Sequence, residues 1–231
     1  MSEITSAEWT AILLSLRVAV VATLVATPFG IALAWLLARY NFWGKSVLDA
    51  LVHLPLVLPP VVTGYLLLLA LGRRGLVGAW LADNLGIVFA FRWTGAALAC
   101  GVMSFPLLVR PIRLSIEAID RRLEQAASTL GAAPWKVFAT ITLPLALPGI
   151  LAGMVLGFAK AIGEFGATIT FVSNIPGETQ VISSAIYSLI QTPDGDAAAM
   201  RLVIISIVIA TAALIGSEWF ARRATQRLHG N

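Results

Sequence analysis

The sequence predicts an all-α membrane protein, a polytopic bundle of helices that cross a lipid bilayer. Of its 231 residues, 58% are hydrophobic and only 12% are charged, whereas soluble domains have about 45–50% and about 25%. A mean hydropathy of +0.88 leaves too little polar surface to cover a globular protein of 24.5 kDa. One cysteine, Cys100, and two histidines, His53 and His229, fit neither a disulfide scaffold nor a usual zinc site. A soluble enzyme and a nucleic-acid-binding domain also fit poorly, and no metal site is expected.

Five apolar runs have the length that a membrane-spanning helix needs, which is about 20 residues. We expect them within a single membrane domain that covers residues 10–220. The stretch 76–91 is apolar enough to hold a short extra helix, so the expected number of spans is five or six. The expected spans are residues 10–38, 47–71, 94–112, 144–172 and 200–220.

The distribution of lysine and arginine predicts how the chain is oriented. Cytoplasmic loops are enriched in these residues. With five spans and the N-terminus outside, the residues on the outer side are Arg73, Arg74, Arg92 and Arg201. The larger set then lies inside: Arg39, Lys45, Arg110, Arg113, Arg121, Arg122, Lys136, Arg222, Arg223 and Arg227. We therefore expect the N-terminus outside and the C-terminus in the cytoplasm.

Proline and glycine occur inside three of the expected spans. Pro28 and Gly30 are expected to interrupt the first span, Pro55, Pro59 and Pro60 the second, and Pro106 the third. Each proline removes a backbone donor, and the carbonyl left over must be satisfied by a neighbouring helix or a water-lined cavity. Broken helices favour a bundle with an internal path, although kinks that only serve packing are an equal alternative.

The fourth expected span carries a repeat of small residues. Gly149, Gly153 and Gly157 recur every four residues and so share one helix face. Such a stripe allows a second helix to approach closely. The sequence leaves open whether that helix belongs to the same chain or to a second copy.

The cytoplasmic segment 119–143 has clear helix boundaries. Asp120 suits the N-cap of a helix over residues 121–130 and places an acid at its positive end. Gly131 suits the left-handed position that ends a helix, and Pro134 suits the first turn of the next one. The segment therefore predicts a short cytoplasmic helix.

This short helix has an apolar face made by Leu123, Ala127 and Leu130, with the small Ala126 beside it. A narrow apolar helix on the cytoplasmic side suits a groove in another protein. An ordinary amphipathic connector that lies on the bilayer is the alternative.

The spacing Gln125-Ala126-Ala127, Gly131, Ile141-x-Leu143-Pro144 resembles the EAA loop of ABC importer permeases. Gln125 stands where that family usually has glutamate, and Glu124 precedes it. The resemblance implies that the loop forms a coupling helix that docks on an ATP-hydrolysing subunit. The residues that it assigns to coupling are Glu124, Gln125, Ala126, Ala127, Leu130, Gly131, Ile141, Leu143 and Pro144.

Three further stretches resemble the membrane subunits of molybdate importers: residues 53–64, 163–168 and 174–179. The similarity extends from the first span to Trp219. The resemblance implies a type I ABC importer permease of the bacterial inner membrane, which acts as a homodimer with ATPase subunits and a periplasmic molybdate-binding protein. ATP and magnesium would bind the ATPase, and this chain would hold no cofactor. Since sulfate and thiosulfate permeases share part of the pattern, a sulfate, thiosulfate or tungstate permease is the alternative.

The chain contains no ATPase motif of its own. Gly44-Lys45-Ser46 matches only the end of a phosphate-binding loop, because Arg39 stands where the loop needs its first glycine. No paired catalytic groups lie within a span, which disfavours an intramembrane enzyme. A passive channel would need neither an ATPase nor a docking helix. We therefore expect a transporter subunit without enzymatic activity.

Ionisable residues inside a span are costly and are therefore candidates for function. Lys160 and Glu164 lie four residues apart and are expected to pair, which favours a structural role. A position near the transport pathway or a dimer interface is the alternative. Gly163 and Gly166 would loosen the helix as a gate requires, and Thr168 would offer a hydroxyl. These five residues are the candidates for the pathway or gate.

Overall fold

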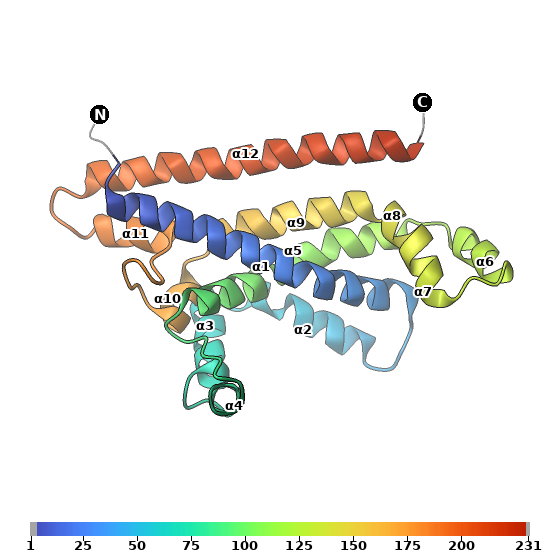
Figure 1. Cartoon of the computed structure of the whole chain (residues 1–231), viewed down its shortest axis with the longest axis horizontal. Helices are drawn as coiled ribbons and strands as arrows, with labels where there is room; N and C mark the ends of the chain where they lie inside the picture. Colours follow the sequence, from blue (N-terminus) through green and yellow to red (C-terminus); the bar gives the residue numbers. More distant parts are fainter. Residues whose placement is uncertain (1–3, 230–231) are drawn as a thin grey trace.

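The fold is a bundle of long helices that run along one axis, with short helices at both ends and on one side (Figure 1). This computed structural model describes residues 4–229, except the side chains of 214 and 217–229. The long helices are α1 (Ser6–Arg39), α5 (Trp93–Glu117), α9 (Leu147–Ile162) and α12 (Asp196–His229). Within the described residues, three helices are long and apolar enough to cross a membrane, and the number rises to five if each of two bent helix pairs is one span. The predicted all-α membrane fold is therefore confirmed.

The first span is a single helix, so the predicted interruption at Pro28 is wrong. Helix α1 continues through Pro28 to Arg39. A proline removes only one helical hydrogen bond, and the helix resumes where neighbours support it. Gly30 serves close packing instead, because a Cβ atom there would lie 2.0 Å from Leu108 Cδ2 of α5. Helix α5 likewise continues through Pro106, which corrects the same prediction for the third span.

The second span is broken at Pro59 and Pro60, as predicted, but the predicted interruption at Pro55 is wrong, because α2 continues through it. Helix α2 (Lys45–Val57) and helix α3 (Pro60–Leu71) meet at an angle of 115°. Pro59 has no N–H group to continue α2, and Pro60 occupies the first turn of α3, where a proline costs nothing. As a result, α3 leaves the direction of the bundle and turns aside (Figure 1).

The fourth span differs from the expected 144–172. Helix α9 ends at Ile162, and a separate helix, α10 (Gly166–Val172), follows a break at residues 163–165. Before α9, a chain of short helices over Pro134–Leu145 meets it at 67°. Helix α10 packs on α3 at close range, since a Cβ atom on Gly64 would lie 2.5 Å from the Ala167 carbonyl oxygen. The two short helices, α3 and α10, therefore pack together, and Ala167, Phe171 and Val172 of α10 are buried in the same core as residues of α1 and α5.

The glycine stripe of α9 faces α5 of the same chain, which answers the question that the sequence left open. A Cβ atom on Gly149 would lie 2.3 Å from Ser115 Cβ, and one on Gly153 would lie 2.5 Å from the Leu108 carbonyl oxygen. Gly157 has more room, with 3.6 Å to the nearest atom. The stripe is thus a contact between two spans of one chain.

Two short helices complete the fold. Helix α4 (Leu76–Leu85) confirms the extra helix suspected at residues 76–91, but its 10 residues are too few to cross a bilayer. Helix α11 (Ile182–Leu189) was not predicted. The expected span 200–220 lies within α12, but Arg222, Arg223 and Arg227 lie outside the described side chains.

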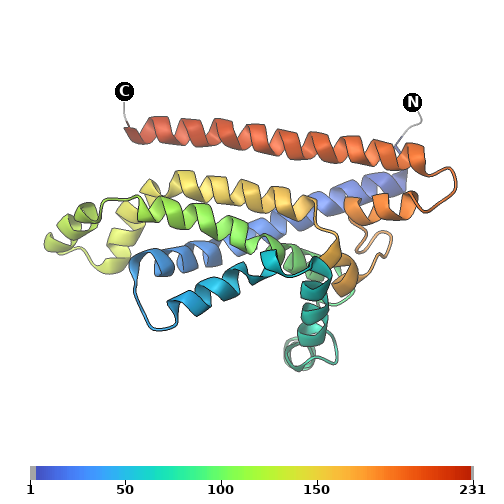
Figure 2. The same cartoon turned by 180° about the vertical axis from the view of Figure 1, so that it is seen from behind.

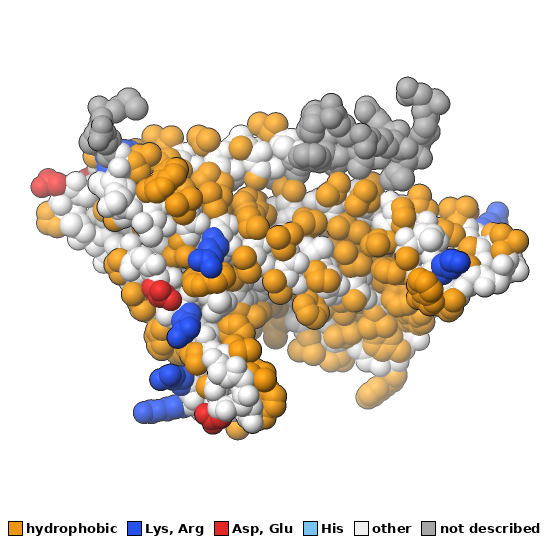
Figure 3. All heavy atoms as spheres, in the orientation of Figure 1, with side chains coloured by type: hydrophobic (Ala, Val, Ile, Leu, Met, Phe, Trp, Pro, Cys, Tyr) orange, Lys and Arg blue, Asp and Glu red, His pale blue; other side chains and the backbone are white. Residues whose placement is uncertain are grey.

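The surface fits a bilayer environment. Seen from behind, α12 runs along one side of the bundle beside α9 (Figure 2). Its outward side chains are apolar and exposed, as at Ile204, Ile207 and Val208. Hydrophobic side chains cover the middle of the visible face, while charged ones lie mainly toward the ends and on the α4 projection (Figure 3).

Candidate functional site

The predicted cytoplasmic helix is present as α6 (Arg121–Thr129). The Asp120 carboxylate accepts a hydrogen bond of 2.9 Å from the Arg122 N–H, as an N-cap should. Gly131 has a φ of +84°, the left-handed conformation that ends a helix. Pro134 begins the next helix, α7 (Pro134–Val137). Local signals in the sequence therefore set both ends of α6.

Helix α6 lies at one end of the molecule, and the start of α1 lies at the other (Figure 1). None of its residues is buried. Leu130 is 89% exposed and Trp135, in the following helix, is 71% exposed, while Leu123 is half-exposed. Exposed apolar side chains on a projecting part of a protein are typical of a surface that binds a partner.

Glu124 and Gln125 point in different directions. Gln125 is exposed, whereas Glu124 turns toward the bundle. Its carboxylate pairs with Arg39 in the last turn of α1, with 3.0 Å between Arg39 Nε and Oε2. Its Oε1 atom also accepts a hydrogen bond of 2.6 Å from the Thr142 hydroxyl. Sequence reasoning missed Arg39 and Thr142 here, because nothing in the spacing along the chain indicates that they meet Glu124.

The remaining EAA-loop residues connect α6 to α9. Ile141 lies in a π-helical turn, η1 (Phe138–Thr142), and Leu143 and Pro144 form α8 (Leu143–Leu145). All three are half-buried. A π-helical turn is rare and is frequent at functional sites. From Pro134 to Leu145 the connection is thus continuous helix, and it bends at Ala146 before α9 begins.

Lys160 and Glu164 meet as expected, but at a break and not on a continuous helix. The Lys160 ammonium lies 2.7 Å from Glu164 Oε2, and the Glu164 side chain is 1% exposed. The other oxygen, Oε1, accepts a hydrogen bond of 3.0 Å from the Ala167 N–H at the start of α10. The Glu164 carbonyl accepts a bond of 2.7 Å from the Ser183 hydroxyl. Glu164 therefore joins α9, α10 and α11.

The other candidates for the pathway differ in their access to solvent. Gly163 is exposed at the break and Gly166 is half-buried. Thr168 is buried, and its hydroxyl donates to the Phe165 carbonyl at 2.9 Å. This hydroxyl therefore already donates its hydrogen bond to the backbone of its own chain segment. Lys160 is the charged member of this set with a partly exposed side chain, at 29%, whereas the Glu164 side chain is buried.

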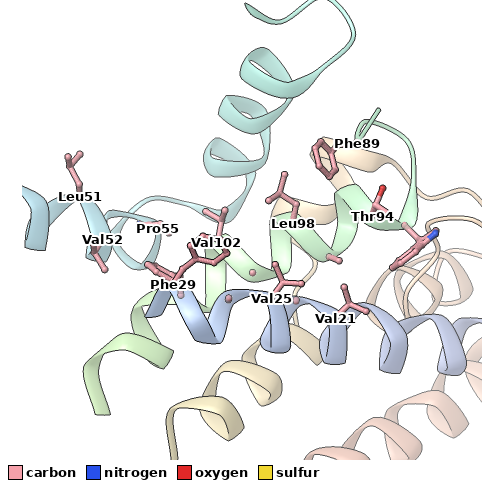
Figure 4. Close-up of a pocket in the computed structure, with 16 residues that line it drawn as sticks. Val21, Val25, Phe29, Leu51, Val52, Pro55, Phe89, Thr94, Leu98 and Val102 are labelled. Atoms are coloured by element: carbon pink, nitrogen blue, oxygen red, sulfur yellow. The ribbon is translucent and has the colours of Figure 1, made fainter. Parts of the chain in front are cut away.

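An apolar cavity of about 660 Å³ lies between α1, α2 and α5. Val25 and Phe29 of α1 face Leu98 and Val102 of α5 across it, with Pro55 of α2 at one end (Figure 4). None of the candidate pathway residues lines this cavity. Among the described residues there is also no group of histidine, cysteine, aspartate or glutamate that could hold a metal ion.

Comparisons with known proteins agree with this geometry. Residues 26–226 match the family described as binding-protein-dependent transport system inner membrane component. The chain is 62% identical, over 97% of its length and 98% of the relative's, to the molybdenum transport system permease protein ModB of Escherichia coli. The Haemophilus influenzae protein of the same description is 58% identical over 96% of each chain. The Escherichia coli sulfate transport system permease protein CysT is 38% identical over 85% of this chain and 70% of its own.

Solved structures show the fold. A crystal structure of a bacterial ABC transporter that imports alginate gives a TM-score of 0.74 at 21% identity, covering 96% of this chain and 81% of that one. An inward-facing structure of the MetNI methionine ABC transporter gives 0.67 at 15% identity, covering 98% and 100%. The chain therefore belongs to the family of binding-protein-dependent transport system inner membrane components, which are multi-pass transport subunits with no enzymatic activity and no cofactor of their own.

Proposed function

We propose that this chain is the permease subunit of an ATP-driven importer that carries molybdate across the bacterial inner membrane. The observation that carries the proposal is the 62% identity to a molybdenum permease over nearly the whole of both chains. The sulfate permease is 38% identical and is matched over a smaller share of its length. The difference favours molybdate over sulfate as the transported oxyanion.

In this proposal α6 is the coupling helix that docks on a separate ATPase subunit. Its support is the exposed apolar group of Leu123, Leu130 and Trp135, together with the absence of any buried residue in α6. Gln125 lies on the exposed side and would meet the partner without a charge. A second copy of the chain would complete the transporter, with one coupling helix for each ATPase subunit.

The proposed orientation places α6 in the cytoplasm and the start of α1 outside. The support is that these two ends lie at opposite ends of the bundle, and that α6 and its neighbours carry Arg121, Arg122 and Lys136. The periplasmic binding protein would then dock near the start of α1 and α11. Nucleotide-driven movement of the ATPase subunits would reach the spans as rigid-body motion through α6.

Within the bundle, we assign the break at residues 163–165 to the moving part of the pathway. A carboxylate on the route of an oxyanion would repel it, but Lys160 neutralises Glu164 at 2.7 Å. The Glu164 side chain therefore joins α9 to α10 through Lys160 and the Ala167 N–H, and its backbone carbonyl binds α11 through Ser183. Gly163 leaves the backbone room to bend, whereas Gly166 packs closely on α3, where a Cβ atom would lie 2.7 Å from Pro60 Cβ. Gly149, Gly153 and Gly157 keep α9 against α5 during this movement.

Reconstitution tests the proposed substrate. The chain is purified with its ATPase subunit, placed in liposomes and supplied with its binding protein and ATP. We expect uptake of radiolabelled molybdate that depends on ATP and is little reduced by an equal concentration of sulfate. If sulfate competes as well as molybdate does, the substrate is wrong. Uptake by the chain alone, without ATP, would identify a passive channel instead.

A further inference from the structure

We propose that Glu124 is a positioning residue that ties the coupling helix to two membrane spans at once, through Arg39 and Thr142. These three residues are called the coupling clamp below. The inference rests on the proposed function, because it assumes that α6 receives force from an ATPase subunit. It adds a specific route by which that force enters the bundle.

The clamp joins three elements at one carboxylate. Arg39 belongs to the last turn of α1, and its Nε and Nη2 atoms lie 3.2 Å and 3.1 Å from Glu124 Oε1. Thr142 belongs to η1, which leads through α8 into α9, and its hydroxyl lies 2.6 Å from the same oxygen. A displacement of Glu124 therefore acts on α1 and on the segment before α9 together.

Neighbouring contacts hold the clamp in place. Arg39 Nη2 also donates to the Ile119 carbonyl, and Arg121 Nη2 donates to the Ala38 carbonyl, each at 3.4 Å. The end of α1 thus donates to the segment just before α6 and accepts from the first residue of α6. Trp35 of α1 packs edge-on against Phe138 of η1, with 5.3 Å between ring centroids. The clamp therefore lies where α1, α6 and η1 already converge.

The Arg39–Glu124 ion pair is largely buried, and its geometry is fixed. The side chains of Arg39 and Glu124 are only 9% and 18% exposed, so water screens the charges weakly. A planar guanidinium with two N–H groups on one carboxylate also fixes the relative orientation of the two side chains. Since α6 has no buried residue, apolar packing alone does little to hold it against the bundle. Removing the carboxylate leaves the Arg39 charge without its partner and frees α6 to move independently.

The test measures molybdate taken up per ATP hydrolysed in the reconstituted complex. Glu124→Gln keeps the size of the side chain and removes the charge. We expect the ATPase subunit to co-purify as before and ATP hydrolysis to continue. Uptake per ATP should fall about tenfold. A tenfold fall corresponds to about 1.4 kcal/mol, which is less than the free energy lost when one partner of a buried ion pair is removed. Glu124→Asp, which keeps the charge, should restore part of the coupling.

A double substitution tests whether the clamp acts as one unit. If it does, Arg39→Gln combined with Glu124→Gln lowers uptake per ATP no further than either change alone. Additive losses would show that Arg39 and Glu124 act separately and would overturn the clamp.

Glu117→Gln is the matched control. Glu117 is also a carboxylate near the cytoplasmic end and pairs with an arginine, but its partner Arg113 lies in the same helix at 2.8 Å. This control should keep the normal uptake per ATP. If Glu124→Gln also keeps it, or if Glu124→Gln loses the ATPase subunit on purification, the clamp is refuted. A failure of the unsubstituted complex to import molybdate would instead refute the proposed function.

Discussion

The close contact between α9 and α5 predicts different effects of alanine at Gly153 and at Gly157, because the new Cβ atoms would lie at different distances from α5. Gly153→Ala adds a Cβ atom that would lie 2.5 Å from the Leu108 carbonyl oxygen, a backbone atom with little freedom to move. Such overpacking costs about 1–3 kcal/mol. Alanine also stabilises a helix by about 0.5–1 kcal/mol relative to glycine. We expect a net loss of stability of up to about 2.5 kcal/mol from these two terms.

Gly157→Ala is the control on the same face of the same helix. Its new Cβ atom would lie 3.6 Å from Leu108 Cβ, which is an ordinary van der Waals distance. Only the gain in helix propensity remains, so the variant should be as stable as the unsubstituted protein or more stable by about 0.5–1 kcal/mol.

The single cysteine supplies the assay. Cys100 is buried in α5, and its sulfur lies 3.6 Å from the Ala161 carbonyl of α9. A maleimide dye therefore reacts with Cys100 only when α5 and α9 separate. When the protein is heated in detergent, the temperature at which half of Cys100 is labelled should be lower for Gly153→Ala than for Gly157→Ala. Equal midpoints, or the reverse order, would refute the assignment of this stripe to the contact with α5.

Two further substitutions test the coupling segment and the broken helix. Gly131→Val places a branched side chain at a φ of +84°, which costs about 1–2 kcal/mol locally, so insertion should be normal but less ATPase subunit should co-purify. Gly131→Asn, which tolerates this conformation, is its control, and normal attachment of the valine variant would contradict the docking role. Lys160→Gln leaves the buried Glu164 carboxylate without its counter-charge and should lower the Cys100 labelling midpoint by an amount equivalent to about 1–3 kcal/mol. An unchanged midpoint would show that the pair does not stabilise the junction of α9, α10 and α11.

Local chemistry explains which predictions were confirmed. The ends of α6 follow from Asp120, Gly131 and Pro134, each of which acts on its own backbone or on the next turn. The break at Pro59 follows from two adjacent prolines, which no helix interior accommodates. The membrane class follows from composition alone.

Other features required neighbours that are distant in the sequence. Pro28 was expected to interrupt its span, yet α1 continues through it, with α5 packed closely at Gly30. The end of α9 at Ile162 was missed because a run of apolar residues continues through Val172. Helix α11 was missed because its eight residues are too few for a span, although its apolar residues recur at helical spacing, at Ile182, Ala185, Ile186 and Leu189.

The amino-acid sequence by itself determined that this protein folds in a lipid bilayer, which family it resembles, and where α6 begins and ends, because composition and interactions within a few residues decide these. Only the tertiary structure decided which glycines face α5, and that Glu124 turns inward to Arg39 and Thr142 while Gln125 faces out. Those outcomes depend on packing between helices that are far apart in the sequence. The spacing of residues along one chain segment carries no information about the partner that another segment brings to it.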